Sequence, residues 1–231
     1  MTEPPSVGRV FRARRRVRLS DVDAAARLRL DSVARYLQDV ASDDVEDSGW
    51  SSEERLWIVR RTQIEVVRPV QGSETVELAT WCSGTAASAA ARRTSVHGSE
   101  GGRIETETIW IHLDAAGRPL RLPQRFLDVY APSADGRRAS TRLELPEPQL
   151  DAPRAPWPLR RTDIDQLGHV NNAAYWAAVE ERLAPTGSLR AELEYRRPVD
   201  LDDTVELALS PGGLAFLVGG ELRASARVSA L

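Results

Sequence analysis

The residues best suited to chemistry stand close together at positions 163–175, which read D-I-D-Q-L-G-H-V-N-N-A-A-Y. The carboxylate of Asp165 has the chemistry of a nucleophile or of a general base toward water, and a positioned base contributes about 10²–10⁴-fold to a rate. The imidazole of His169, four residues later, is suited to hold that water or to hydrogen-bond Asp165. Both side chains also have a structural interpretation, in which they brace the loop. Together they indicate attack on an acyl carbonyl, or its hydration.

Asn171 and Asn172 stand where this segment is predicted to enter a helix. Asparagine is a favoured N-cap residue, so helix capping is one interpretation of the pair. The first N–H groups of a helix lack intrahelical acceptors and the helix dipole favours negative charge there, so a backbone N–H near Asn172 is also a candidate oxyanion donor. Loss of one such donor typically costs about 10²–10³-fold in rate. Tyr175, one turn later, is predicted to lie in the core or in a pocket wall.

The composition of the 231 residues excludes several other kinds of chemistry. All 31 basic residues are arginine, which excludes a Schiff-base lysine, a P-loop lysine and a Ser-Lys dyad. Cys82 is the only cysteine, so no intrachain disulfide can form. One cysteine and three scattered histidines argue against a zinc site. No G-x-S-x-G, dinucleotide-binding or phosphate-loop motif is present, and we expect no cofactor.

The charge and hydropathy patterns bear on partners and location. A net charge of −3 gives no electrostatic reason to expect nucleic acid or an anionic membrane. No apolar run approaches about 18 residues, so we expect no membrane span, and the amino terminus M-T-E-P-P lacks the apolar region of a signal peptide. We therefore expect a cytoplasmic protein. Residues 9–18 alternate arginine with apolar residues, which favours a half-solvated strand and leaves open a patch that steers an acidic partner or phosphate.

The chain carries an internal repeat. Residues 20–28 read S-D-V-D-A-A-A-R-L, a weaker copy of the segment around Asp165 found 142 positions earlier, with Arg27 in the place of His169. Residues 64–78 and 193–207 agree at eight of fifteen positions. Two matching segments in the same order predict a duplicated unit. Because the first copy lacks the histidine, only the second is expected to have kept its chemistry.

Each half is predicted to contain a strand, a helix and four further strands, which is an α+β class of fold. The helices are expected at about 31–47 and 172–183, each ending near a glycine or proline. Between the halves, residues 132–158 are rich in proline, arginine and serine and are predicted to be an extended linker. The strands are expected at about 10–19, 57–67, 75–84, 87–97 and 103–113, then at 159–162, 189–196, 204–210, 214–218 and 222–228.

This pattern resembles the hot-dog fold, in which a curled antiparallel sheet wraps one long helix, and its tandem form resembles the acyl-ACP thioesterase family. The similarity extends over most of the chain. In the first half it rests on residues 27–41 (R-L-R-L-D-S-V-A-R-Y-L-Q-D-V-A), 57–66 (W-I-V-R-R-T-Q-I-E-V) and 118–130 (R-P-L-R-L-P-Q-R-F-L-D-V-Y). In the second half it rests on the segment at 163–175 and on L-E-Y-R-R-P-V at 193–199.

The resemblance implies two tandem hot-dog units that hydrolyse fatty acyl-ACP to free fatty acid and carrier protein, without cofactor or metal. Residues 1–131 would bind the acyl chain and residues 159–231 would carry catalysis through Asp165, His169 and Asn172. The expected substrate-binding residues are Asn171, Tyr175, Trp57 and Tyr36, and the other tunnel candidates, which are equally core candidates, are Leu37, Val40, Trp81 and Trp110. An arginine-rich rim, formed by residues 12–18 with Arg60, Arg61, Arg92 and Arg93, would receive the acidic carrier.

The chain departs from the best-known members of that family at two positions. Leu167 occupies the place of an asparagine in their Asp-x-Asn-x-His motif, and Pro198 follows Tyr-Arg-Arg where they have Glu-Cys. Glu194 could replace that glutamate only if its side chain points inward, and its twin Glu65 in the other half favours a structural role. Two alternatives therefore stay open, an acyl-CoA thioesterase and a non-catalytic acyl-binding protein. So do the chain length, a covalent or water-mediated role of Asp165, and a monomer or a homodimer.

Overall fold

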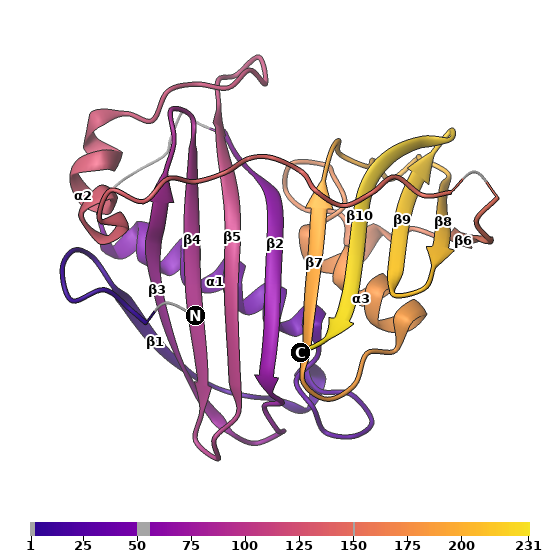
Figure 1. The fold of residues 1–231 in the computed structure, drawn as a ribbon, viewed down its shortest axis with the longest axis horizontal. Coiled ribbons are helices and arrows are strands. Elements are labelled where there is room, and N and C mark those ends of the chain that lie inside the picture. The colour runs from indigo at the N-terminus through magenta and orange to yellow at the C-terminus, as the bar shows by residue number, and fades with distance from the viewer. Residues whose placement is uncertain (1–2, 50–55, 150) are drawn as a thin grey trace.

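Across the residues that the structure describes, which are 3–49, 56–149 and 151–231 of the computed structural model, ten strands form one antiparallel sheet (Figure 1). Their order is β1-β3-β4-β5-β2-β7-β10-β9-β8-β6. The N-terminal half contributes β1 (Phe11–Arg16), β2 (Leu56–Arg68), β3 (Thr75–Thr85), β4 (Ala89–Gly98) and β5 (Arg103–Leu113), and the C-terminal half contributes β6 (Arg154–Trp157), β7 (Leu189–Tyr195), β8 (Val205–Ser210), β9 (Gly213–Val218) and β10 (Glu221–Ala230).

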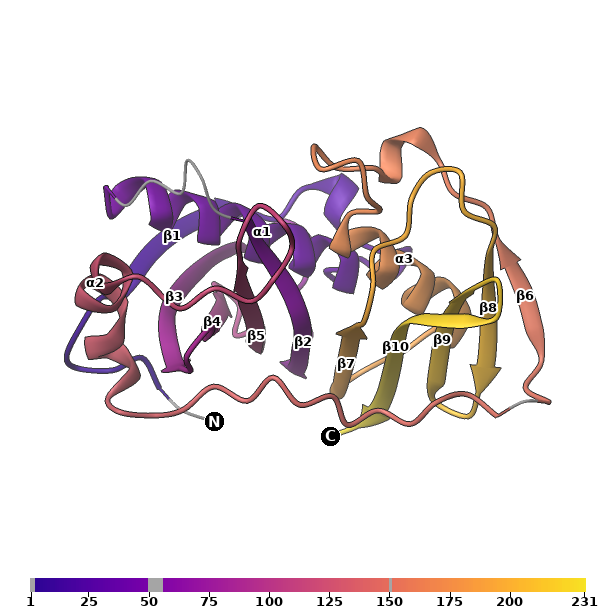
Figure 2. The same ribbon diagram turned by 90° about the horizontal axis from the view of Figure 1, so that it is seen from above.

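The curled sheet holds α1 (Leu30–Asp47) and α3 (Asn172–Leu183) on its concave face, while α2 (Gln124–Ala134) closes one end (Figure 2). Apolar residues of α1 recur at helical spacing, and Leu30, Val33 and Leu37 are buried against the sheet while Arg35 is exposed. One long helix wrapped by an antiparallel sheet, formed twice, confirms the predicted α+β class. The predicted bounds of both long helices are within one residue of those observed.

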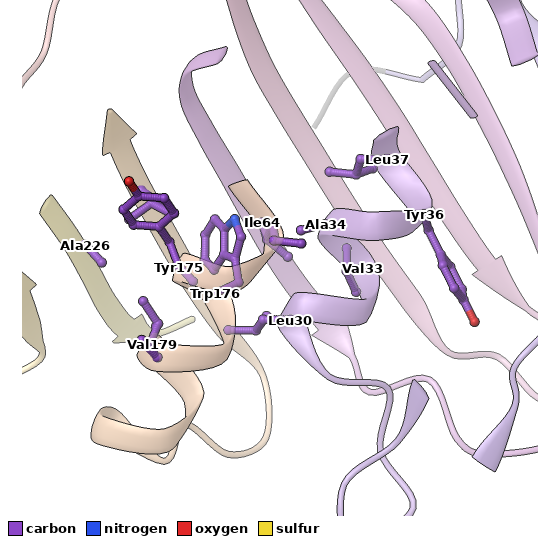
Figure 3. Close-up of a cluster of buried hydrophobic side chains, with 14 of the residues drawn as sticks. Leu30, Val33, Ala34, Tyr36, Leu37, Ile64, Tyr175, Trp176, Val179 and Ala226 are labelled. Carbon is purple, nitrogen blue, oxygen red and sulfur yellow. The ribbon is translucent and has the colours of Figure 1, made fainter. Parts of the chain in front are cut away.

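The two halves meet where β2 pairs with β7. Gln63 lies opposite Glu192 in this ladder, and these residues are equivalent in the internal repeat, so the halves are related by an approximate twofold axis. The core is continuous across the junction: Trp176 of α3 packs beside Ile64 of β2 and Ala34 of α1 (Figure 3). Trp176 and Ile64 are almost fully buried. The buried apolar surface that holds α3 in place is therefore supplied by both halves.

The segment between the halves differs in part from the prediction. α2 extends to Ala134 and β6 pairs with β8, so ordered elements occupy both ends of the stretch predicted as a linker. The strand predicted at 159–162 is wrong, because the strand comes earlier and Arg161–Asp163 forms a short 3-10 helix. Pro156 suits β6 because proline is tolerated in an edge strand, where its missing N–H leaves no ladder bond unmade.

The remaining linker crosses the outer face of the sheet (Figures 1 and 2). Glu194 of β7 points to that face and is fully buried beneath the chain. Its Oε1 accepts the backbone N–H groups of Glu144 and Leu145. Alternation along β7 places Leu193 and Tyr195 in the core on the opposite face, so Glu194 cannot point inward. Its predicted structural role is therefore the one that the geometry supports.

Candidate active site

The loop before α3 is shaped by the carboxylate of Asp165. Its Oδ1 accepts the backbone N–H of Leu167 at 2.8 Å and that of His169 at 3.4 Å. Gly168 completes the turn with a φ of +83°, which glycine adopts without a Cβ penalty. The loop-bracing interpretation of Asp165 thus accounts for Oδ1. Its Oδ2 has no hydrogen-bond partner among the described residues and remains available to a ligand.

The imidazole of His169 turns to Asp200 rather than to Asp165. Nδ1 of His169 lies 2.6 Å from Oδ1 of Asp200, and the two side chains are 43% and 61% exposed. A carboxylate at Nδ1 holds the neutral ring in the tautomer that carries its proton there, which leaves Nε2 as an acceptor. No hydrogen bond joins the side chains of Asp165 and His169 in the part of the chain that the structure describes.

The start of α3 offers a free backbone donor. Oδ1 of Asn171 accepts the N–H of Ala173 at 2.8 Å, which makes Asn171 the N-cap, and it also accepts a hydrogen bond from Nε2 of Gln38 at 3.2 Å. The backbone N–H of Asn172 finds no acceptor among the described residues. The helix dipole adds a partial positive charge at this point. An anion forming there would meet an unpaired donor, as the sequence predicted for an oxyanion.

The equivalent loop of the N-terminal half has the same backbone but a neutralised carboxylate. Oδ1 of Asp23 accepts the N–H groups of Ala25 and Arg27, as Asp165 does for its own loop. Ala26, at the position of Gly168, likewise has a positive φ of 60°. Here, however, the guanidinium of Arg27 lies 2.6 Å from Oδ2 of Asp23. The replacement of His169 by arginine therefore occupies the oxygen that Asp165 keeps free.

The helix start of the N-terminal half also differs. The carboxylate of Glu180, from α3, faces the start of α1, where the backbone N–H groups of Leu30 and Asp31 lower its pKa against the larger effect of burial, and its Oε2 makes no hydrogen bond within the described residues. Burial raises the pKa of Glu180 to about 7. Gln38 holds the equivalent position in α1, eight residues into the helix, and its amide leaves the N–H of Asn172 unpaired. One of the two related helix starts thus faces a buried carboxylate, and the other faces the neutral amide of Gln38.

A cavity of about 340 Å³ lies in the N-terminal half, between α1, α2 and the concave face of the sheet. Gln166, from the loop before α3, contributes to its wall, so the cavity opens beside the candidate active site. A narrow void of about 20 Å³ shares Gln38, Arg92 and Trp110 with the cavity and reaches Asn172. The cavity wall consists of Gln38, Ala41, Ser42, Val45, Trp57, Cys82, Ala90, Ala91, Arg92, Trp110, Phe126, Tyr130 and Gln166.

Some of the predicted substrate-binding residues lie in this cavity and others lie elsewhere. Trp57 lines it, but Tyr36 is on another face of α1, where its hydroxyl donates to Asp21 at 2.6 Å. Tyr175 is buried, and its ring packs edge-on against Tyr195. The side-chain oxygen of Asn171 accepts the hydrogen bonds of Ala173 and Gln38 described above. Of the other tunnel candidates, Trp110 lines the cavity, Leu37 lines the narrow void, Val40 lies in the core and Trp81 lies on the outer side of the sheet.

The sequence did not single out Gln38 or Asp200. Asp200 directly follows the repeated R-R-P-V segment, and its equivalent in the first half, Gln71, forms the matching backbone bridge to Arg27. The position of Asp200 directly after a repeated segment could have identified it as a neighbour of His169. Gln38 carried no such signal, because a polar residue on an amphipathic helix is ordinarily solvent-exposed.

The predicted arginine-rich rim does not form one surface. Arg92 lies inside the cavity wall, and Arg60 donates to the carbonyl of Tyr195 at 3.0 Å. Arg61 and Arg93 line a hollow of about 320 Å³ on the outer face of the sheet. The arginines of β1 occupy the far edge of the sheet. A carrier protein could therefore contact only part of this set at once.

Within the described residues, no group of three or more histidine, cysteine, aspartate or glutamate side chains is placed to hold a metal ion. Nor does any described helix combine the length and the apolar character needed to cross a membrane. The candidate active site is accordingly defined by the open start of α3, the side chains of Asp165, His169 and Asp200, and the adjoining cavity.

Comparison with known proteins identifies the family to which both parts of the chain are similar. Residues 8–130 match the N-terminal domain of the acyl-ACP thioesterases, and residues 147–215 match their C-terminal domain. An uncharacterised protein of Mycobacterium tuberculosis is 34% identical over 235 residues, which cover 98% of this chain and 94% of that protein. A chloroplastic acyl-[acyl-carrier-protein] hydrolase of Cuphea viscosissima is 26% identical over 90% of this chain, which spans 57% of that protein's length.

Solved structures show the same fold. The 12:0-ACP thioesterase of Umbellularia californica superposes with a TM-score of 0.79 at 20% identity, covering 95% of this chain and 96% of that one. An acyl-ACP thioesterase of Bacteroides thetaiotaomicron gives a TM-score of 0.78 at 17% identity, with the same coverage of each chain. The tandem hot-dog fold is thereby confirmed. Because its two halves match, in order, the two domains of one family, the chain belongs to the acyl-ACP thioesterase family and is a thioester hydrolase.

Proposed function

We propose that this protein hydrolyses fatty acyl-ACP to free fatty acid and carrier protein at the start of α3. The observation that carries the proposal is the contrast between the two helix starts. At α1 the backbone donors face the buried carboxylate of Glu180, whereas at α3 the N–H of Asn172 faces no carboxylate and lies at a narrow void that shares Gln38, Arg92 and Trp110 with the cavity. The family membership supports the carrier-bound substrate.

In the proposed mechanism, the thioester carbonyl oxygen accepts the N–H of Asn172. Nε2 of His169 takes a proton from water as the water oxygen attacks the carbonyl carbon, and Oδ2 of Asp165 holds that water by accepting its second proton in a hydrogen bond. The negative charge that forms on the carbonyl oxygen is stabilised by the Asn172 N–H and the helix dipole. The C–S bond then breaks, and His169 returns its proton to the departing sulfur.

In this proposal, the two halves of the chain have different roles. Residues 1–131 bind the acyl chain in the cavity behind Trp57 and Trp110, residues 132–158 connect the halves, and residues 159–231 supply the catalytic groups. Gln166, an exposed residue of the loop before α3, lines the cavity, so in this proposal the phosphopantetheine arm of the carrier enters from the side of α3. The two halves already pair through β2 and β7, so a single chain contains a complete site.

Release of free thiol from acyl-ACPs and acyl-CoAs of several chain lengths tests the proposal. Asp165→Asn is expected to lower kcat/KM by at least about 10²-fold, because the held water loses its acceptor. Asp23→Asn is the matched control, since it changes the equivalent carboxylate of the N-terminal half and is expected to leave kcat unchanged.

The outcome also separates the alternatives. Faster turnover of acyl-CoAs than of acyl-ACPs would replace the carrier protein by coenzyme A as the substrate carrier. A wild-type protein that hydrolyses no thioester but retains acyl chains would refute the proposed reaction. Leu167 and Pro198 would then mark the loss of catalysis, and the protein would be an acyl-binding module.

A further inference from the structure

Arg92 is a cation in the wall of the cavity, and 13% of its side chain is exposed. It lies on β4, and strand alternation directs it to the concave face. Its Nη1 donates to Oδ2 of Asp44 at 2.7 Å and to Oγ1 of Thr80 at 3.2 Å. Asp44 is itself 1% exposed and is held from the other side by Arg9 at 2.6 Å. The guanidinium is therefore fixed in place by an ion pair that water scarcely reaches.

Most of the hydrogen-bonding capacity of Arg92 is unused within the described residues. A guanidinium has five N–H donors, and the two hydrogen bonds of Arg92 both use Nη1; its Cζ also lies 5.6 Å from the centre of the Tyr130 ring, a contact that uses no N–H. Nε and Nη2 of Arg92 have no hydrogen-bond acceptor in the described structure, and neither atom is fully enclosed by protein. Arg92 lines both the cavity and the narrow void. Its free donors are thus accessible from the space that an acyl chain would enter.

The depth of Arg92 can be measured along α1. Gln38, which contacts the start of α3, and Asp44, which holds Arg92, are six residues apart, or about 9 Å at 1.5 Å per helical residue. With C–C bonds of about 1.5 Å, an extended alkyl chain advances about 1.25 Å per carbon. A chain whose carbonyl lies at Asn172 would therefore bring about its eighth carbon to the level of Asp44, where Nη1 of Arg92 is held.

Most of the cavity wall is apolar. Ala41 and Val45 of α1, Trp57 and Trp110 of the sheet and Phe126 of α2 all line it. These side chains suit methylene groups. A methyl group that arrived at Arg92, however, would displace water and cover donors that then have no partner, which is costly. An oxygen atom at the same depth would accept hydrogen bonds from a cation, which are among the stronger ones.

We propose that Arg92 recognises an oxygen on the distal part of the acyl chain, so that the preferred substrates are medium-length acyl groups with a hydroxyl or carboxyl oxygen at about the eighth carbon. This proposal rests on the proposed function and deepens it. It makes Arg92 a specificity-determining residue that touches the far end of the chain and takes no part in the attack on the thioester.

The test compares octanoyl-ACP with 8-hydroxyoctanoyl-ACP, which differ by one oxygen. The wild type is expected to have a kcat/KM about tenfold higher for the hydroxylated chain, the size of one hydrogen bond to a charged group. Arg92→Met is expected to abolish this preference and to raise kcat/KM for decanoyl-ACP. Arg93→Met, on the outer face of the same strand, is the matched control and should keep the wild-type preference.

Loss of folding is separated from loss of recognition by two further proteins. Asp44→Asn/Arg92→Met removes both partners of the ion pair, and Arg92→Lys keeps the charge; thermal unfolding shows whether each is folded. Equal kcat/KM for the two chains in the wild type, or an unchanged preference in a folded Arg92→Met protein, would overturn the proposal. If the wild type hydrolyses neither chain, the proposed function fails instead, and calorimetry with octanoate and 8-hydroxyoctanoate then decides the role of Arg92 by itself.

Discussion

At the scale of single residues, the carboxylate of Asp200 gives His169 its orientation. The hydrogen bond to Nδ1 leaves Nε2 free to take a proton, so Asp200 is a positioning residue for the proposed base. Asp200→Asn is expected to lower kcat by about 10–100-fold with little change in KM, because substrate binding does not involve it. Steady-state kinetics on one acyl-ACP measure both constants. Asp202→Asn, an exposed neighbour, should behave as wild type, and a fall in kcat of equal size there would contradict this role.

The candidate site was predictable to the extent that it lies in one short segment. Asp165, His169 and Asn172 are local neighbours, and the repeat predicted that the second half had kept them. Asp200 is 31 residues from His169, and Gln38 is 133 residues from Asn171. Such pairs are set by strand register and helix packing, which depend on long-range contacts that no local pattern contains.

At the scale of elements, the starts of α1 and α3 face different side chains, Glu180 and Gln38. The buried carboxyl group of Glu180 is expected to make the stability of the fold depend on pH. Burial raises the pKa of Glu180 to about 7 from the ordinary glutamate value of 4.5, so the folded state binds a proton that the unfolded state has released across this range. The associated stability is fully present below about pH 4.5 and is lost as the pH rises through 7.

Glu180→Gln is therefore expected to remove this dependence. Between pH 5 and pH 8, the free energy of unfolding of the wild type should fall by about 1–3 kcal/mol more than that of the variant. Urea titrations at the two pH values measure the difference. Glu181→Gln, an exposed neighbour, is the control. A parallel pH dependence in wild type and Glu180→Gln would show that Glu180 is ionised alike in both states.

The element predictions succeeded where hydrophobic periodicity was strong and failed where proline dominated. α1 and α3 have clear apolar faces and clear stops, so their bounds follow from the sequence. β6 and α2 do not, because Pro156 and Pro132 lie inside them and both residues favour a loop assignment. The pairing of β6 with β8 and the packing of α2 against β3 outweigh that local preference.

At the scale of the whole molecule, the two halves share one core and are expected to unfold together. Trp176 of α3 is 1% exposed and packs against residues of both halves. Trp176→Ala is expected to cost about 3–5 kcal/mol of unfolding free energy, since it leaves a large cavity at the junction. Equilibrium unfolding in urea, followed by circular dichroism, should show one transition shifted to lower denaturant.

The exposed helix position Glu181→Ala is the matched control for that experiment and should leave the midpoint in place. Two separated transitions in the Trp176→Ala protein, with one unchanged from the wild type, would mean that a half is stable alone. The continuous β2–β7 ladder argues against this, because an isolated half would expose a long edge strand as well as the apolar face of its helix.

Because the start of α1 faces the carboxylate of Glu180, we expect each chain to bind one acyl group. A chain with two related units but one helix start that faces no carboxylate should titrate with one equivalent of a tight, non-hydrolysable acyl analogue per 25.5 kDa, and a homodimer with two. Replacing Glu180 with alanine would remove the carboxylate that faces Leu30 and Asp31 without supplying a histidine beside them. The count of productive sites per polypeptide would remain one, because Arg27 still occupies the carboxylate of Asp23.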